Sequence, residues 1–218
     1  MSLPALSLLE TRVLGVLIEK QHTVPDTYPL TLNALVAGCN QKTSRDPVLE
    51  ATEAEVQAAL DHLRGFTLVV ESSGGRVMRY SHNIERVLAI PSQAVALIAV
   101  IMLRGPQTTG ELRQHSERLH RFADISSVEG FLDELAHRPA GALVVELPRA
   151  AGARETRWAH LLSGPPVVAS VEEATSVERV SLGEIATLRT HITELREELA
   201  QVKDTVNRLV RELGITPE

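Results

Sequence analysis

The sequence predicts a mainly helical α+β protein, built from two tandem winged helix-turn-helix domains and a C-terminal coiled-coil helix. Two observations lead to this prediction. A helix followed by a β-hairpin occurs twice along the chain, and apolar residues near the C-terminus recur with a seven-residue period. We place the first domain at residues 1–84, the second at 85–163, a linker at 164–180 and the coiled-coil helix at 181–214.

The duplication is clearest between residues 52–82 and residues 124–160. The offset between matching residues is 72 in the helix, 75 in the first strand and 78 in the second strand, so it grows only where turns lie. Loops of different length within a duplicated unit would produce this pattern. The matching helix residues are Val56 and Val128, Leu60 and Leu132, Asp61 and Asp133, and Leu63 and Leu135.

The first domain opens with a helix predicted over residues 7–20, in which Ser7 and Glu10 form a capping box before a broad apolar stripe. A connector leads to a second helix, predicted over Tyr28–Cys39 with Pro29 in its first turn, where the missing N–H costs nothing. A polar loop over residues 40–51 follows.

The third helix is predicted from the capping box of Thr52 and Glu55 to a stop at Gly65. Strands at residues 67–71 and 76–82 then pair across a glycine-containing turn. Three helices closed by a two-stranded ribbon is the order of a winged helix-turn-helix domain.

The second domain repeats this order. We expect helices over residues 92–103 and from about residue 105, the latter because residues 105–112 echo residues 28–35 at an offset of 77. A capping box of Ser126 and Glu129 predicts the start of the third helix, and residues 142–147 and 154–161 form the predicted hairpin.

The C-terminal segment carries a strict heptad pattern, with apolar residues alternately three and four positions apart. So narrow an apolar stripe requires a partner helix. In a heptad labelled a to g with Ile185 at a, β-branched residues at a and Leu at d favour a parallel homodimer. A trimer, or a helix that packs on its own domains, is an alternative. The predicted coiled-coil interface is Ile185, Leu188, Ile192, Leu195, Leu199, Val202, Val206, Leu209 and Leu213.

Composition limits the class of protein. The net charge is −6, and neither domain is strongly basic: residues 1–84 hold 7 Lys/Arg against 9 Asp/Glu, and residues 85–163 hold 9 against 9. The longest apolar run, residues 94–103, is too short to span a bilayer. Because the sequence has no secretory leader and a single cysteine, we expect a cytoplasmic protein without disulfides. We expect that cysteine, Cys39, to be a buried apolar side chain near a helix end.

The run from Val24 to Leu35, followed by the run from Cys39 to Val48, resembles the YceH-like family of bacterial proteins of unknown function. The resemblance covers roughly residues 5–163. It implies tandem winged helices in a bacterial cytosolic protein. It implies no activity, and no catalytic or binding residue follows from it.

No enzyme motif is present, so we predict a protein without catalytic residues, cofactor or metal. The Lys42-Thr43 pair lacks the glycine of a phosphate loop, and no two histidines have the i, i+4 spacing of a helical metal site. His82 and His160 lie at equivalent ends of the two hairpins, which we interpret as a structural consequence of the duplication.

Duplex DNA is the first partner to consider, because the third helix of a winged helix usually enters the major groove. Both third helices are acidic here, however, and carboxylates repel phosphates. The predicted DNA contacts therefore lie mainly in the preceding loop and the hairpin: Gln41, Lys42, Thr43, Ser44, Arg45, Gln57, Arg64, Arg76 and Arg79. The alternative for this basic set is ordinary surface charge, with Arg45 and Asp46 bracing the loop.

In the second domain, Arg113, Arg118 and Arg121 are balanced by acidic neighbours, so the better DNA candidates are Arg149, Arg154 and Arg157. Two functions from different classes remain open. One is a homodimeric DNA-binding protein of the transcription-regulator type. The other is a protein-interaction scaffold that uses the acidic winged helices and the C-terminal coil.

Overall fold

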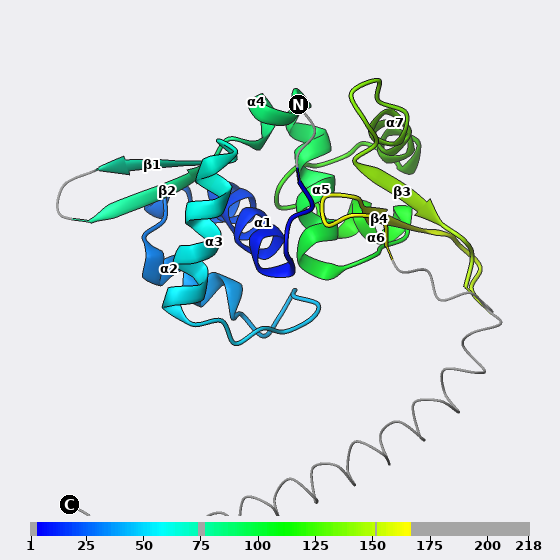
Figure 1. Ribbon diagram of the computed structural model, residues 1–218. Coiled ribbons are helices and arrows are strands. Elements are labelled where there is room, and N and C mark those ends of the chain that lie inside the picture. The colour runs from blue at the N-terminus through cyan, green and yellow to red at the C-terminus, as the bar shows by residue number, and fades with distance from the viewer. Residues whose placement is uncertain (1–3, 74–76, 151, 167–218) are drawn as a thin grey trace, which may run out of the picture. The chain divides into compact units, whose positions relative to one another are not determined.

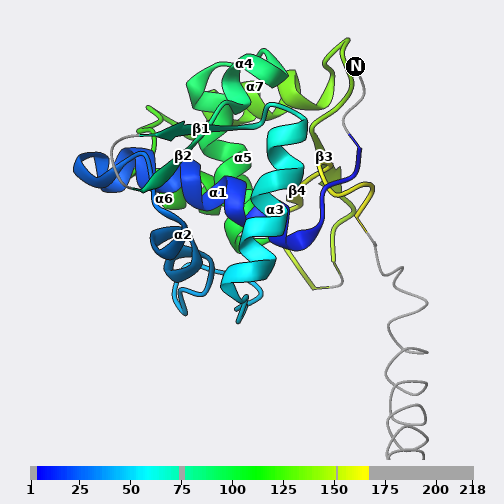
Figure 2. The same ribbon diagram turned by 60° about the vertical axis from the view of Figure 1, so that its left-hand side comes forward.

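The computed structural model describes residues 4–73, 77–150 and 152–166, which form a mixed α+β structure with two small antiparallel hairpins (Figures 1 and 2). The elements of the first repeat, in chain order, are α1 Leu8–Thr23, the 3-10 turn η1 Pro25–Thr27, α2 Leu32–Cys39, α3 Glu53–Gly65, β1 Val69–Ser73 and β2 Met78–His82. After a short helix, α4 Ile84–Leu88, those of the second repeat are α5 Ser92–Arg104, α6 Thr109–His115, α7 Ile125–Ala136, β3 Val144–Leu147 and β4 Arg157–His160.

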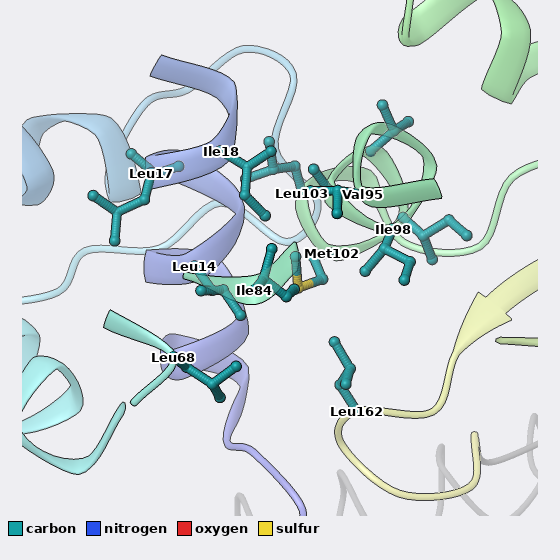
Figure 3. Packing of buried hydrophobic residues seen from close by; sticks show 14 of the residues in the cluster. Leu14, Leu17, Ile18, Leu68, Ile84, Val95, Ile98, Met102, Leu103 and Leu162 are labelled. Atoms are coloured by element: carbon teal, nitrogen blue, oxygen red, sulfur yellow. The ribbon is translucent and has the colours of Figure 1, made fainter. Parts of the chain in front are cut away.

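The core is built around α1 and α5, the first long helix of each repeat. Every residue from Glu10 to Ile18 and from Ala94 to Leu103 is buried, so both helices are covered on all sides at their centres. The two helices pack on each other, and a Cβ added at Gly15 would lie 3.0 Å from Leu103 Cγ. Figure 3 shows core side chains from both helices. The two repeats therefore share one continuous core through equivalent elements.

The two hairpins have the same register. Val69 faces His82 in the first hairpin, and Val144 faces His160 in the second. The second strand of each hairpin also pairs with one residue outside the hairpin. Tyr80 of β2 forms a β-bridge with Leu30, and Trp158 of β4 forms one with Gln107. These matching positions keep the sequence offsets of the duplication, so each repeat closes its sheet in the same way.

The capping boxes predicted for α1 and α3 are confirmed. The predicted start of α2 at Tyr28 is wrong: Thr31 caps the helix by accepting a hydrogen bond from the Ala34 amide at 3.3 Å. The reason is that the backbone of Leu30 is used in the bridge to Tyr80, with N–O distances of 3.0 and 2.8 Å, and cannot also enter the helix.

The predicted cap of α7 is also wrong. Asp124, not Ser126, is the N-cap, and its Oδ1 accepts a hydrogen bond from the Ser127 amide at 2.8 Å. Aspartate is as good a capping residue as serine, so the helix begins earlier than the Ser126 to Glu129 pattern suggested. Similarly, α6 starts at Thr109, after a capping box of Thr108 and Glu111, and the short helix α4 was not predicted.

The described residues belong to one compact unit that spans residues 1–168 and contains the predicted boundary at residues 84–85. Within them, no helix combines the length and the apolar character needed to cross a membrane. The predicted coiled-coil helix, residues 181–214, lies outside the described residues, as does most of the predicted linker.

Candidate nucleic-acid interface

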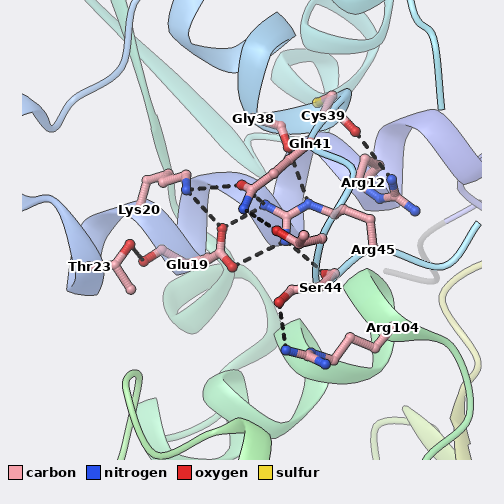
Figure 4. Close-up of polar contacts among 11 residues, drawn as sticks. Arg12, Glu19, Lys20, Thr23, Gly38, Cys39, Gln41, Ser44, Arg45 and Arg104 are labelled. Atoms are coloured by element: carbon pink, nitrogen blue, oxygen red, sulfur yellow. Dashed lines mark hydrogen bonds and ion pairs between the residues drawn. The ribbon is translucent and has the colours of Figure 1, made fainter. Parts of the chain in front are cut away.

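The loop predicted to contact DNA, residues 40–47, is anchored to the core by Arg45. The Arg45 side chain is buried, and its two terminal nitrogens donate to the two Glu19 carboxylate oxygens at 3.1 and 2.6 Å (Figure 4). Its Nε also donates to the Gly38 carbonyl at 3.2 Å. Burial alone would raise the pKa of Glu19, but the hydrogen bonds and charge of Arg45 hold it below its ordinary value.

The prediction that Arg45 contacts DNA is therefore corrected. A guanidinium with this many protein partners and almost no exposed surface has no donors left for a phosphate. The alternative weighed for this residue, that it braces the loop, describes its position.

Arg12 of α1 supports the two ends of the same loop. It is fully buried and donates to the carbonyls of Cys39 at 3.2 Å and Pro47 at 2.7 Å. Its Nε has no partner in the described structure, and burial lowers the pKa of the guanidinium, helped by the positive charge of Arg45. Sequence reasoning missed this role. The available signal was that Arg12 lies within the apolar stripe of its helix, three residues after Leu9 and four before Val16.

The other predicted loop contacts divide between bound and exposed groups. The Ser44 hydroxyl accepts a hydrogen bond from Arg104 of α5 at 2.7 Å. Gln41 is half-buried, accepts from Lys20 and Arg45, and donates to the Thr43 hydroxyl at 3.3 Å. Lys42 is exposed, so it is the loop's one solvent-facing cation.

The predicted contacts on α3 are occupied by protein partners. Gln57 donates to Asp61 at 3.0 Å and accepts from the Tyr80 hydroxyl at 3.2 Å. Arg64 lies between two carboxylates, at 3.2 Å from Asp61 and 2.5 Å from Glu71. Its charge is therefore more than balanced locally.

On the first hairpin, Arg79 donates to the backbone carbonyls of Thr27 and Pro29, at 3.2 and 2.8 Å. Arg76 lies outside the described residues. The predicted basic residues that the structure describes in the first repeat are therefore not gathered into a positive surface, because Arg45, Arg64 and Arg79 are held by carboxylates or carbonyls.

The second repeat differs in its charge pairing. Arg118, Arg121, Arg149, Arg154 and Arg157 are all exposed, and none of them forms an ion pair with another described residue. All the ion pairs found in the described structure involve residues of the first repeat.

In the sequence, acidic neighbours balance Arg113, Arg118 and Arg121. Two of these neighbours, Glu111 and Asp124, cap helices in the structure. Glu111 accepts from the Thr108 amide at 2.8 Å, and Asp124 accepts from the Ser127 amide at 2.8 Å. Between α6 and the segment before α7, a cavity of about 360 Å³ is lined by two arginines and one carboxylate, Arg113, Arg121 and Glu117. The first turn of α7 contains no acidic residue, whereas that of α3 contains Glu53 and Glu55.

Nothing in the described residues gathers three or more His, Cys, Asp or Glu side chains in a geometry that could hold a metal ion. Cys39 is the last residue of α2 and fully buried, as predicted, and burial raises the pKa of its thiol to about 12. Burial also lowers the pKa values of His82 and His160 to about 4, so both imidazoles are neutral at pH 7. The predicted coiled-coil residues from Ile185 to Leu213 lie outside the described structure.

Comparison with known proteins identifies relatives over most of the chain. The family model described as "Protein of unknown function, DUF480" matches residues 6–153. The chain is 58% identical over 202 residues to a UPF0502 protein of Dechloromonas aromatica, covering 93% of this chain and 94% of the relative. It is 56% identical over 211 residues to a UPF0502 protein of Leptothrix cholodnii, covering 95% of both. The chain therefore belongs to the DUF480 family, also called UPF0502, in agreement with the resemblance drawn from its sequence.

Proposed function

We propose that this chain is a non-enzymatic, cytoplasmic DNA-binding protein of tandem winged-helix fold, in which the second repeat contacts the duplex. The order of three helices and a hairpin, present in each repeat, supports the fold. The observation that carries the function is a set of exposed arginines on the second hairpin, Arg149, Arg154 and Arg157, none of which forms an ion pair with another described residue. In winged helices this hairpin contacts phosphate or the minor groove.

The start of α7 supports the same assignment. The N-terminal residues of a recognition helix are those that reach base edges. In α7 these positions hold Ile125, which is 48% exposed, and the exposed Ser126. A serine hydroxyl can bond to several bases, and an apolar side chain can contact the thymine methyl. The corresponding turn of α3 presents Glu53 and Glu55, so we assign the DNA contact to the second repeat.

Salt-dependent binding tests the proposal. The full chain is titrated against a labelled duplex of random sequence, starting at about 50 mM salt, and the affinity is followed as salt rises. Each phosphate contact contributes about 0.9 to the slope of log affinity against log salt. Substituting Arg149, Arg154 and Arg157 by alanine together should weaken binding and lower the slope by about 3.

The matched control removes Lys42 and Arg64 of the first repeat, both to alanine, and should leave affinity and slope nearly unchanged. Absence of binding at low salt, or loss of binding in the first-repeat control alone, would overturn the proposal.

A protein-interaction scaffold is the second candidate function. It is favoured by the first repeat, in which Arg64 is shared by two carboxylates and Arg45 is buried, so α3 keeps a net negative charge from Glu53 and Glu55. The two functions are compatible, because they use different repeats. Homodimerisation through the heptad seam from Ile185 to Leu213 would present both repeats twice, and truncation after residue 180 should then reduce binding mainly through loss of avidity.

A further inference from the structure

The first hairpin exposes apolar side chains that the second hairpin lacks. Val70, Val77 and Met78 are 42%, 55% and 42% exposed. At the offsets of the duplication, the last two correspond to Glu155 and Thr156, so the second hairpin is polar where the first is apolar. Clustered apolar side chains on a protein surface commonly mark an interaction site.

The outer strand of this hairpin has a free edge. β1 pairs with β2 on one side, and the bridge from Leu30 covers the opposite side of β2. β1, with the sequence Val69 to Ser73, therefore forms the outer edge of the described sheet and contains neither lysine nor proline, the residues that usually protect such edges. Figure 1 shows the hairpin projecting from the helices. Its backbone edge can pair with an added strand.

A groove of about 780 Å³ runs between this edge and the C-terminal half of α3. Apolar Val69, Val70 and Met78 line it together with the charged residues Asp61, Arg64 and Glu71. Since one guanidinium is shared by two carboxylates, the groove carries a net charge of −1 and keeps carboxylate oxygens that can accept from another cation.

We propose that this groove binds an extended segment of a partner protein, which adds a strand to β1 and alternates aliphatic with basic side chains. Main-chain hydrogen bonds would supply affinity, and alternate side chains would supply specificity, as in other cases of strand addition. Side chains alternate between the two faces of a sheet, so the aliphatic ones would lie beside Val70 on its exposed face. The basic ones would lie on the opposite face, where they would meet Asp61 and Glu71. This inference uses the first repeat alone and does not depend on DNA binding by the second.

Charge argues against occupants from this chain itself. A second copy pairing through its own β1 would bring Glu71 and no cation, so like charges would meet. The segment 167–180 carries Glu172, Glu173 and Glu178 against one arginine and is disfavoured for the same reason.

A direct binding experiment tests the proposal with the full chain. The probe is a labelled hexapeptide of alternating Val and Lys, and the controls are a peptide with Glu in place of Lys and a block peptide of three Val followed by three Lys. The alternating peptide should bind, the two controls should not, and amide hydrogen exchange should slow along β1 when the peptide is bound.

Two matched variants locate the site. Glu71→Gln should weaken peptide binding about fivefold, the effect expected for one partly exposed charge pair. Glu146→Gln changes the equivalent position of the second hairpin and should have no effect. Failure of the alternating peptide to bind, equal binding of the block peptide, or equal loss in both variants would overturn the proposal. If Val70→Asp changes the oligomeric state of the chain while the peptide does not bind, the occupant is a second copy and the proposal is wrong.

Discussion

Arg45 donates hydrogen bonds to both carboxylate oxygens of Glu19, and this pair ties the loop of residues 40–47 to α1. The pair lies at the centre of a polar cluster around Ser44, to which α1, α2 and α5 all contribute (Figure 4). A stretch that looks in the sequence like a basic, solvent-facing loop is therefore anchored to the core through the buried side chain of Arg45.

Removing Arg45 should strongly destabilise the protein. Arg45→Ala leaves Glu19 without its main partner and the Gly38 carbonyl without its donor, and breaking a buried pair costs about 3 to 5 kcal/mol. Urea unfolding measures the loss. Lys42→Ala, in the same loop but exposed, should change stability by less than about 0.5 kcal/mol. Equal effects of the two substitutions would contradict a structural role for Arg45.

The helix contacts at Gly38 should not tolerate a methyl group. A Cβ at Gly38 would lie 2.6 Å from Val16 Cγ1, so Gly38→Ala should destabilise the fold by about 1 to 3 kcal/mol despite its better helix propensity. Gly130→Ala, within α7 and with no atom near the added Cβ, should stabilise by about 0.5 to 1 kcal/mol. Thermal or urea unfolding distinguishes the two signs, and a stabilising Gly38→Ala would refute the close packing of α1 on α2.

Stability should fall as the pH drops from about 6.5 toward 4. Burial lowers the pKa values of His82 and His160 to about 4, so in this window the unfolded state binds protons that the folded state does not. Each histidine can cost up to about 3 kcal/mol by pH 4. Carboxylates with lowered pKa values, such as Glu19, add to the loss only below their ordinary pKa of 4.5.

His160→Asn tests this pH dependence, because asparagine is neutral throughout. The variant should show a smaller loss of unfolding free energy between pH 7 and pH 4.5 than the unsubstituted chain. The same substitution at the exposed His137 is the control. An unchanged slope in His160→Asn would show that folding does not lower the pKa of this imidazole.

The heptad seam predicts a homodimer in solution. Light scattering coupled to size exclusion should give twice the mass of one chain, and Leu195→Asp, at a d position, should give the single-chain mass. Ala200→Asp adds the same charge at a b position, outside the seam, and should remain dimeric. A threefold mass would instead assign a trimer, and a single-chain mass for the unsubstituted protein would contradict self-association.

The start of a helix could be predicted from the sequence only where the residues that cap it are close together in the chain. The capping boxes of Ser7 and Thr52 involve residues three positions apart, so both starts were predicted correctly. The start of α2 was not, because it depends on a bridge between Leu30 and Tyr80, which are 50 residues apart. At α7, Asp124 and Ser126 are both good caps, and the sequence alone gives no reason to choose between them.

The candidate site was harder to predict than the fold. The sequence shows which residues carry charge, but solvent exposure decides whether that charge is available to a ligand. Arg45, Arg64 and Arg154 look alike in the sequence; in the structure the first is buried, the second is shared by two carboxylates and the third is exposed.

The sequence by itself determined the duplication, the order of helices and hairpins in each repeat, and the membership of the family, since periodicity, capping and similarity are properties of the chain. Only the tertiary structure decided that α1 and α5 pack into one core, that Arg12 and Arg45 lie inside it, and that β1 forms an outer edge of the described sheet. Those outcomes depend on contacts between residues far apart in the sequence. Whether a side chain is buried or forms an ion pair is decided by which segments the fold brings next to it.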